Sequence, residues 1–385
     1  MNLKKIFSKG NLMYALFLFV FLVICLEIFG RVYLSVILHK SSKPKFQFSY
    51  TRIYEHIPGF REGDGKRDWI VINHQGFRRT EDVSKEKPAN TVRIFLLGGS
   101  AAHGISSAAP YPIVHIYPDE TIDAWLEKDL KAKFPESKME VINAAVTGYM
   151  VFQHTGYILS ELLDYDPDIM IFFDGVNDHY FNDTTYNYYL QNRYQFWKPR
   201  LQQPTFGGMT TYFMHWLSKY SGFARGYMAW KLNRDAQKND AKRTVNNMYG
   251  GSAEIIESHK KIAPKQFLRA VETNLSILRN HGVKALVCLQ PMLVLRDSSL
   301  YSPQEKSFYA DNLFARILYP TVLDELKDVT SRHEVPVLDI NAEFNNPEYK
   351  HQQLFIDYCH LTPLGGAVAA KAMLPALDSL IQNLK

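Results

Sequence analysis

Five short runs of consecutive apolar residues, separated by segments with helical periodicity, constrain the fold of this 385-residue chain most strongly. The runs lie at residues 92–97, 139–143, 168–173, 284–290 and 335–340. The helical segments lie at residues 121–134, 153–163, 266–280, 307–332 and 364–384. A strand that is apolar on both sides needs cover on both faces, which is typical of a parallel sheet between two helix layers. We therefore predict an α/β fold with a five-stranded parallel sheet in a three-layer α/β/α arrangement.

The first forty residues contain a long apolar stretch that one pair of charges interrupts. Residues 12–26 carry no charge, Glu27 and Arg31 follow four residues apart, and apolar residues resume as far as Leu38. Glu27 and Arg31 can pair on one helix face, and with that turn included the stretch reaches the roughly 20 residues that cross a bilayer. No small-residue cleavage site follows, so we predict one uncleaved transmembrane helix; a cleaved signal peptide is the alternative.

The distribution of charge predicts an orientation and excludes one class of partner. The chain has 44 Lys and Arg residues against 39 Asp and Glu residues, and residues 1–40 carry +4 of the net +5. Lys4, Lys5 and Lys9 precede the apolar stretch, which predicts a cytoplasmic amino terminus and a body in the periplasm or outside the cell. The body is nearly neutral, whereas nucleic-acid binding needs a concentrated basic face. We therefore expect no nucleic-acid partner.

The pattern divides the chain into three parts. Residues 1–40 are the cytoplasmic end and the anchor, and residues 41–90 form a turn-rich lead-in with a small strand pair. Residues 91–385 form the main domain, which an insert at about 183–262 interrupts. The aromatic part of that insert holds Lys219 and Arg225, so we exclude a second membrane span there. We interpret the insert either as an ordinary helical insertion or as a lid or membrane-facing surface beside the site.

Three cysteines, Cys25, Cys288 and Cys359, are too few for a disulfide scaffold and lack the paired spacing of a zinc site. The sequence signals no metal and no organic cofactor. Outside the cell a Cys288–Cys359 disulfide is one interpretation, and a packed free thiol at position 359 is the other.

Reactive side chains follow the predicted strands, and in such sheets the site lies at the carboxyl ends of the strands. Ser100 comes directly after the first strand, in Gly-Gly-Ser-Ala-Ala, where it can begin a helix with its hydroxyl exposed. Asp357 precedes His360 by three residues after the fifth strand, so the carboxylate can orient the imidazole and leave Nε2 free as a base. Each loop alone also fits a capped turn.

Two further loops offer hydrogen-bond donors for an oxyanion. Gly148 follows the second strand, and its backbone amide is open to close approach because the residue has no Cβ. Asn177 follows the third strand in Gly-Val-Asn-Asp, and its side-chain amide can donate to the same oxyanion. A plain turn explains either loop when it is taken alone. The conjunction of all four loops in this order predicts a serine hydrolase site.

These four loops resemble the conserved blocks of the SGNH hydrolases, which are GDSL-type esterases and acylhydrolases. The resemblance covers about residues 92–370, apart from the insert, and its matching positions are Ser100, Gly148, Gly175, Asn177, Asp178, Asp357 and His360. It implies a flavodoxin-like SGNH fold, a catalytic Ser100, His360 and Asp357, and an oxyanion hole from Ser100, Gly148 and Asn177. Gly175 and Asp178 would support the third loop.

The chain departs from this family's pattern at two positions and extends it at another. The glycine of the family's second block, Gly148, is kept, but Tyr149-Met150 follow it where the family has a small hydroxyl residue nearby, which affects the expected shape of the pocket more than the mechanism. The family's Gly-Asp-Ser is Gly98-Gly99-Ser100 here, which removes an acid that is not a triad member. The segment Asn73-His74-Gln75-Gly76-Phe77-Arg78 resembles the lead-in of membrane-anchored bacterial members, and the sequence alone suggests no mechanism for it.

We therefore expect a membrane-anchored, outward-facing serine esterase that cleaves an acyl ester, of which acetyl is one example. An O-acetyltransferase that acts on a cell-envelope polysaccharide is the first alternative, and a non-catalytic anchored binding protein is the second. The expected partners are an acyl-ester substrate, with carbohydrate or lipid as its carrier, and the membrane through the amino-terminal helix. The sequence does not predict an oligomeric state.

Overall fold

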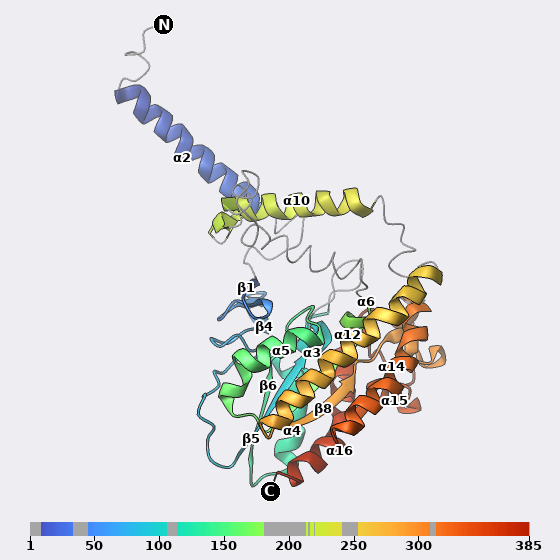
Figure 1. Ribbon diagram of the computed structural model, residues 1–385. Coiled ribbons are helices and arrows are strands. Elements are labelled where there is room, and N and C mark those ends of the chain that lie inside the picture. The colour runs from blue at the N-terminus through green and yellow to red at the C-terminus, as the bar shows by residue number, and fades with distance from the viewer. Residues whose placement is uncertain are drawn as a thin grey trace. The chain divides into compact units, whose positions relative to one another are not determined.

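The computed structural model describes residues 9–33, 45–105, 114–180, 213–214, 216–218, 220–240, 253–308 and 313–384 (Figure 1). The chain divides into two compact units. Residues 1–44 and 190–244 make up the first, which holds α2 (Lys9–Val32) and α10 (Gly222–Asp240). Residues 45–189 and 245–385 make up the second, which holds the sheet.

The second unit is built on the five-stranded parallel sheet that the apolar runs predict. Its strands are β5 (Thr91–Gly98), β6 (Lys138–Asn143), β7 (Ile169–Asp174), β8 (Lys284–Leu289) and β9 (Val337–Asp339). Their order is β6-β5-β7-β8-β9, and every neighbouring pair is parallel. The strand that follows β5 in the chain lies on one side of it, and the later strands lie on the other side. This reversal of strand order at β5 is a topological switch point, where open α/β sheets form their binding crevices.

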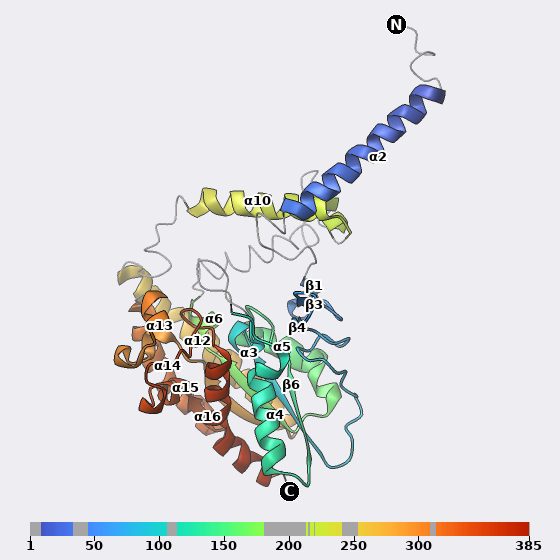
Figure 2. The same cartoon turned by 180° about the vertical axis from the view of Figure 1, so that it is seen from behind.

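Helices cover both faces of this sheet, as Figures 1 and 2 show from opposite sides. One layer contains α4 (Ile122–Lys133), α15 (Ile340–Phe344) and α16 (Pro363–Gln382), and the other contains α5 (Val151–Ser160), α12 (Ala253–Asn280) and α14 (Leu313–Arg332). Alternation along β5 explains the two cores: Ile94 and Leu96 belong to the first, and Phe95 and Leu97 to the second. The three-layer α/β/α prediction is confirmed.

Two of the differences between the element boundaries and the sequence prediction have a clear physical reason. Helix α12 begins at Ala253 rather than at 266, because Pro264 lies inside the helix and the apolar periodicity becomes clear only after it. The last ten residues of the predicted insert are therefore helical. Strand β9 has three half-buried residues, because it is the edge strand of the sheet. Residues 181–212 and 241–252 of the insert region lie outside the described residues.

The lead-in contains two antiparallel strand pairs where one was expected. Strand β1 (Phe46–Ser49) pairs with β2 (Ile53–His56), and β3 (Arg61–Gly63) pairs with β4 (Asp68–Val71). Both pairs belong to the same compact unit as the parallel sheet.

Two helices among the described residues are long and apolar enough to cross a membrane, α2 over Asn11–Val32 and α16. The apolar stretch of α2 has a mean hydropathy of 2.7, and its most apolar part contains no buried residue. Helix α16 buries Val368, Ala369 and Met373 in the sheet core, so its apolar character has a structural explanation. An amino-terminal helix such as α2 is compatible with a membrane anchor or with a signal sequence.

Candidate active site

The four predicted loops meet at the carboxyl edge of the sheet. Strand β5 ends at Gly98, and α3 (Ser100–His103) begins two residues later with Ser100. The loop with Gly148 follows β6, and α6 (Val176–Tyr180), which contains Asn177, follows β7. The loop that precedes α16 brings His360 to the same edge.

Ser100, His360 and Asp357 form one hydrogen-bond chain. The Oγ of Ser100 lies 2.7 Å from Nε2 of His360, and Nδ1 of His360 lies 2.6 Å from Oδ2 of Asp357. The second carboxylate oxygen of Asp357 accepts the backbone N–H groups of Cys359 and His360, at 2.9 and 2.8 Å. The carboxylate therefore fixes both the ring and the backbone of its loop.

Neighbouring elements hold this loop in place. The backbone N–H of Ile356 donates to the carbonyl of His360 at 2.9 Å, which closes the loop on itself. The side chain of Gln290, just after β8, donates to the carbonyl of Cys359, and the N–H of Leu293 donates to the carbonyl of Tyr358. The end of β8 thus supports the loop that carries the imidazole.

Opposing effects act on the pKa of His360. Burial lowers the pKa of His360, whereas the Cys359 sulfur and the hydrogen-bonded Asp357 carboxylate raise it. The combined effect is a pKa well above the usual value for histidine. Burial also raises the pKa of the Cys359 thiol, so the sulfur is neutral near pH 7. We therefore ascribe the raised pKa of His360 to Asp357. Burial opposes ionisation of Asp357, yet the bonds from His360 and the backbone lower the pKa of Asp357.

Asn177 lies against the turn that carries Ser100. Its Nδ2 donates to the carbonyl of Tyr149 at 2.8 Å, which orients the amide and leaves its second N–H available. A Cβ at Gly99 would overlap Nδ2 of Asn177. A side chain at position 99 would therefore displace the amide, which gives a local reason for glycine where the family's pattern has an acid.

We expect Asn177→Ala to lower kcat about 10²- to 10³-fold with little change in KM, because one oxyanion donor is lost from the transition state. Initial rates on p-nitrophenyl acetate measure the effect. Asn280→Ala, at an exposed position at the end of α12, is the matched control and should leave kcat unchanged. A fall of less than threefold for Asn177→Ala would exclude the side chain as an oxyanion donor.

The lead-in contacts the peptide unit that carries the Gly148 amide. The hydroxyl of Tyr54 in β2 donates to the carbonyl of Thr147 at 2.9 Å, and that carbonyl shares its peptide plane with the N–H of Gly148. The hydroxyl of Tyr149 donates in turn to the carbonyl of Tyr54. Fixing one end of a rigid peptide unit fixes the direction of the other, so Tyr54 is a positioning residue for the Gly148 amide.

We expect Tyr54→Phe to lower kcat about five- to tenfold and to cost about 1 kcal/mol of unfolding free energy, the net contribution of one hydrogen bond. KM should change less than twofold, because the lost bond orients a donor to the transition state. Steady-state kinetics with thermal unfolding measure both effects, and Tyr50→Phe, at an exposed position, is the control. An unchanged kcat with lowered stability would leave Tyr54 a purely structural role.

Asp178 lies beside a buried hydrogen-bonded histidine and aspartate that sequence reasoning missed. Its Oδ1 accepts the N–H of Val151, the first residue of α5, at 3.0 Å. Both carboxylate oxygens of Asp174 lie 3.1 Å from Nε2 of His154, and these two side chains are buried. Burial first, and then the charge of Asp174, raise the pKa of Asp178 well above its usual value. The sequence does not mark His154 as part of the site, because its position in the helix is typical of a core residue.

The lead-in segment 73–78 also contacts the helix that carries Ser100. The buried guanidinium of Arg78 donates to the carbonyls of Trp69, His103 and Ile116, at 2.6, 3.2 and 3.1 Å. Burial lowers the pKa of Arg78 to about 10, so the group stays charged at neutral pH.

Asn143, at the end of β6, completes this contact. Its side chain donates to the carbonyl of Ala102 at 2.9 Å, and its own carbonyl accepts the backbone N–H of Arg78. Two successive carbonyls at the end of α3, those of Ala102 and His103, are thereby satisfied. A four-residue helix has little stability of its own, so these bonds hold the Ser100 turn in position.

The cysteines and the side chains that could bind a metal define no second site among the described residues. In the described part of the chain, ligand atoms of Asp357, Cys359 and His360 lie within 4.8 Å of one another. Nδ1 of His360 is bonded to Asp357, so this group coincides with the hydrogen-bond chain of the site. All three cysteines are free, and the Cys288–Cys359 disulfide is not formed.

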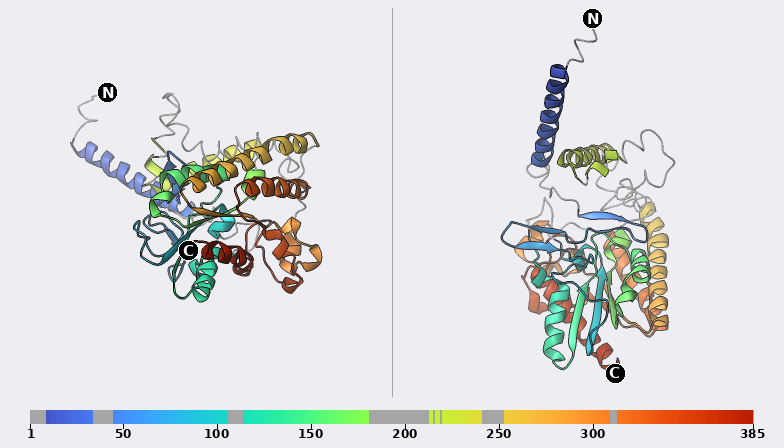
Figure 3. Two further views of the ribbon diagram at one scale, coloured as in Figure 1. Left: turned by 60° about the horizontal axis from the view of Figure 1, so that its bottom comes forward. Right: turned by 90° about the vertical axis from the view of Figure 1, so that its left-hand side faces the viewer.

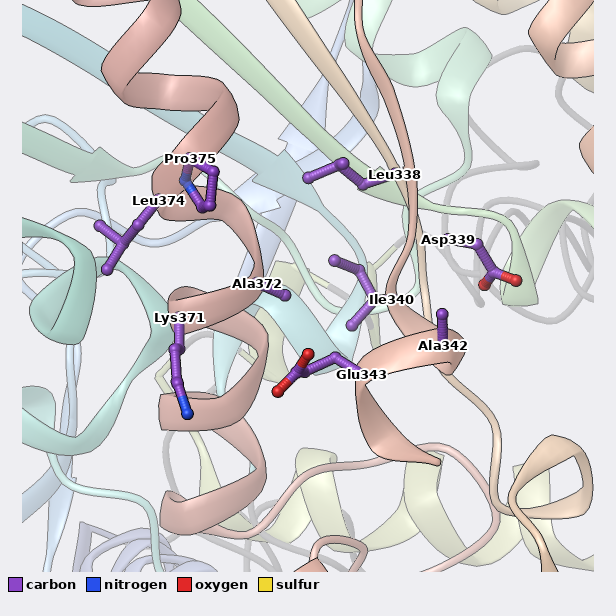
Figure 4. A pocket seen from close by; sticks show the side chains of 9 residues that line it. All are labelled: Leu338, Asp339, Ile340, Ala342, Glu343, Lys371, Ala372, Leu374 and Pro375. Carbon is purple, nitrogen blue, oxygen red and sulfur yellow. The ribbon is translucent and has the colours of Figure 1, made fainter. Parts of the chain in front are cut away.

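A separate groove of about 500 Å³ opens between α15 and α16, and Figure 4 shows its lining. Apolar side chains such as Leu338, Ile340 and Leu374 line it, with Glu343 and Lys371 as charged members. Ser100, Asp357 and His360 are not among its lining residues, so the groove is not the pocket of the predicted chemistry.

Comparison with solved structures finds several that are similar to this chain at low sequence identity. Similar solved structures include the acetyl xylan esterase AlAXEase, with 14% identity over 74% of this chain and 99% of that chain and a TM-score of 0.41. LAE5, an alpha/beta hydrolase enzyme from the metagenome of Lake Arreo, Spain, has 13% identity over 77% of this chain and 98% of that chain, with a TM-score of 0.42. Axe2, an acetylxylan esterase from Geobacillus stearothermophilus, has 12% identity over 76% of this chain and 95% of that chain, with a TM-score of 0.40.

Sequence comparison gives the family. No curated protein matches the chain. The model of the GDSL-like lipase/acylhydrolase family matches residues 96–368, which is well over half of the sequence and includes all four loops. The chain therefore belongs to the GDSL-like lipase/acylhydrolase family, the serine hydrolases that act on ester bonds.

Proposed function

We propose that the protein is a membrane-anchored serine esterase that hydrolyses an acyl ester outside the cytoplasm. The hydrogen-bond chain from Asp357 through His360 to Ser100 carries this proposal, with links of 2.6 and 2.7 Å. A serine hydroxyl is a weak nucleophile at neutral pH, and a hydrogen-bonded imidazole activates it by taking its proton. Anchoring is supported by the long apolar stretch of α2, whose large side chains are mostly exposed, and by the lysines at positions 4, 5 and 9.

In the proposed reaction, Nε2 of neutral His360 accepts the proton of Ser100 while Oγ forms a bond to the acyl carbon. The amides of Ser100 and Gly148 and the side chain of Asn177 receive the negative charge on the carbonyl oxygen. The ester C–O bond then breaks, and the imidazolium donates its proton to the departing alcohol. Water, deprotonated by His360, attacks the acyl-enzyme and releases the carboxylic acid. Asp357 stabilises the imidazolium throughout.

Labelling of the full chain with a fluorophosphonate tests whether Ser100 is activated. We expect one covalent adduct by intact mass, absent from Ser100→Ala and retained in Ser299→Ala, an exposed serine in another loop. A folded protein that forms no adduct would contradict the proposed nucleophile and favour a binding protein that kept the fold.

Product analysis distinguishes hydrolysis from transfer. With an acetyl ester and an oligosaccharide present together, hydrolysis predicts free acetate and an unmodified oligosaccharide. An acetylated oligosaccharide as the main product would contradict the proposal, because a sugar hydroxyl would then outcompete water for the acyl-enzyme.

A further inference from the structure

The first compact unit contains an acidic side chain inside an apolar span, and the structure shows what it binds. The carboxylate of Glu27 in α2 accepts the backbone N–H groups of Gly222 and Phe223 at the start of α10, at 2.6 and 3.1 Å. It also accepts the hydroxyl of Ser221 at 2.7 Å and Nε of Arg31 at 3.0 Å. An ionisable residue in a membrane segment is costly unless it is paired, and here the partners are the free amides of a second helix.

Small residues let these two helices approach closely at the same place. A Cβ at Gly30 would overlap the backbone of Phe223, and a Cβ at Gly226 would lie 3.3 Å from the carbonyl oxygen of Gly30. Close packing of glycines is typical of helix pairs in membranes. The start of α10 is therefore fixed to the last turns of α2 by packing as well as by hydrogen bonds.

The height of this contact along α2 corresponds to the edge of a bilayer. Residues 11–26 of α2 precede Glu27, and at 1.5 Å per residue they extend about 24 Å. The hydrocarbon core of a bilayer is about 30 Å thick, so Glu27 and the start of α10 lie near one of its boundaries. Figures 1 and 3 show that α10 leaves the end of α2 obliquely rather than continuing its axis. A helix that begins at that depth and turns away from the spanning helix is in a position to extend along the interface.

The exposed side chains of α10 and of the turn before it suit that position. Five aromatic residues there are between 40% and 69% exposed: Phe213, Trp216, Tyr220, Tyr227 and Trp230. The guanidinium of Arg234 lies 5.3 Å from the ring centre of Trp230. Exposed Trp and Tyr beside cationic residues are typical of the headgroup region. Helix α10 is not among the described helices that are long and apolar enough to cross a membrane.

We propose that α10 and its preceding turn form an interfacial element, with Trp216 and Trp230 in the boundary region of the bilayer that α2 spans. The inference rests on the anchoring proposed above and adds a second membrane contact from a segment nearly 200 residues away in the sequence. The ligand is the phospholipid interface, and Glu27 and Gly30 hold the element to the anchor.

Tryptophan quenching by brominated lipid tests this inference on the full chain in phosphatidylcholine–phosphatidylglycerol liposomes. We expect phosphatidylcholine brominated at acyl carbons 6 and 7 to quench the wild-type emission. Trp216→Phe/Trp230→Phe should lose most of that quenching, and the matched pair Trp69→Phe/Trp125→Phe should keep it. Quenching that persists in the first pair, or is absent from a wild type that floats with the liposomes, overturns the interfacial element. A protein that carbonate extracts from the liposomes overturns the anchor itself.

A second comparison tests the contact between the two helices. Gly30→Leu places a side chain where Phe223 lies, and we expect it to lower the quenching of Trp216 and Trp230 at least twofold. Ala15→Leu adds similar bulk to an exposed position far along the same helix, and it should leave the quenching unchanged. Equal quenching in Gly30→Leu and Ala15→Leu would show that α10 binds lipid without the anchor and would overturn its attachment to α2.

Discussion

Ser100→Ala is expected to lower kcat about 10⁵- to 10⁶-fold, because in the proposed reaction the nucleophile, its general base and the orienting carboxylate act as a unit. The fall should leave a small residual rate from the oxyanion donors and from substrate binding. Stability should change little, since the Ser100 hydroxyl is a partly exposed group whose structural bond is to His360. Turnover of p-nitrophenyl acetate by the full chain in detergent measures the effect.

The control for this prediction is Ser299→Ala, which removes a hydroxyl from an exposed loop and should retain full activity. Circular dichroism and the unfolding temperature establish that the Ser100 variant is folded. A folded Ser100→Ala protein with more than a hundredth of the wild-type rate would contradict the assignment of this serine as nucleophile.

Asp357→Asn is expected to lower kcat about 10³- to 10⁴-fold and to shift the pH profile in an informative direction. His360 must be neutral to accept a proton, and its pKa lies well above the ordinary 6.5. The acid limb of kcat/KM in the wild type should therefore lie above pH 6.5. Asparagine removes the charge that raises this pKa, so the limb should move to lower pH while the maximum rate falls.

Rates from pH 5 to 10 on an ester without an ionisable acyl group measure both parts of this prediction. Asp297→Asn, which changes an exposed carboxylate of another loop, is the control and should shift neither the limb nor the rate. An acid limb that stays in place or moves to higher pH in Asp357→Asn would contradict the ascription of the raised pKa of His360 to Asp357.

The sheet could be predicted from the sequence because its strands are buried on both faces and read as unbroken apolar runs. Strand β7 is the clearest case, since all six of its residues are buried. The start of α12 could not be predicted in the same way, because Pro264 is disfavoured inside a helix and the residues before it are polar.

The meeting of the side chains of the proposed site could be predicted because they follow strand ends and occur in a known order. Ser100, Asp357 and His360 are brought together from positions up to 260 residues apart, and the parallel sheet explains why they meet. Their neighbours His154 and Asp174 could not be assigned, because their buried hydrogen bond joins two elements whose contact the sequence does not encode locally.

The partners of single residues were hardest to predict. The sequence suggested that Glu27 pairs with Arg31, four residues away, and this pair is present at 2.9 Å. Its bonds to Gly222 and Phe223 join segments that no local pattern relates. Likewise, the segment 73–78 had no predicted role, because the carbonyls that Arg78 binds become neighbours only in the folded chain.

The contacts of Arg78 and Tyr54 determine where a soluble fragment of this enzyme should begin. The family match starts at residue 96 and the sheet at Thr91, and a fragment cut at either point would lack both side chains. The carbonyl of His103 would lose its donor, and the peptide between Thr147 and Gly148 would lose its hydrogen bond. Expression boundaries drawn from the family alignment alone would thus yield a hydrolase with a loosened nucleophile turn. A fragment that begins at Lys45, with the first strand pair intact, retains every one of these bonds.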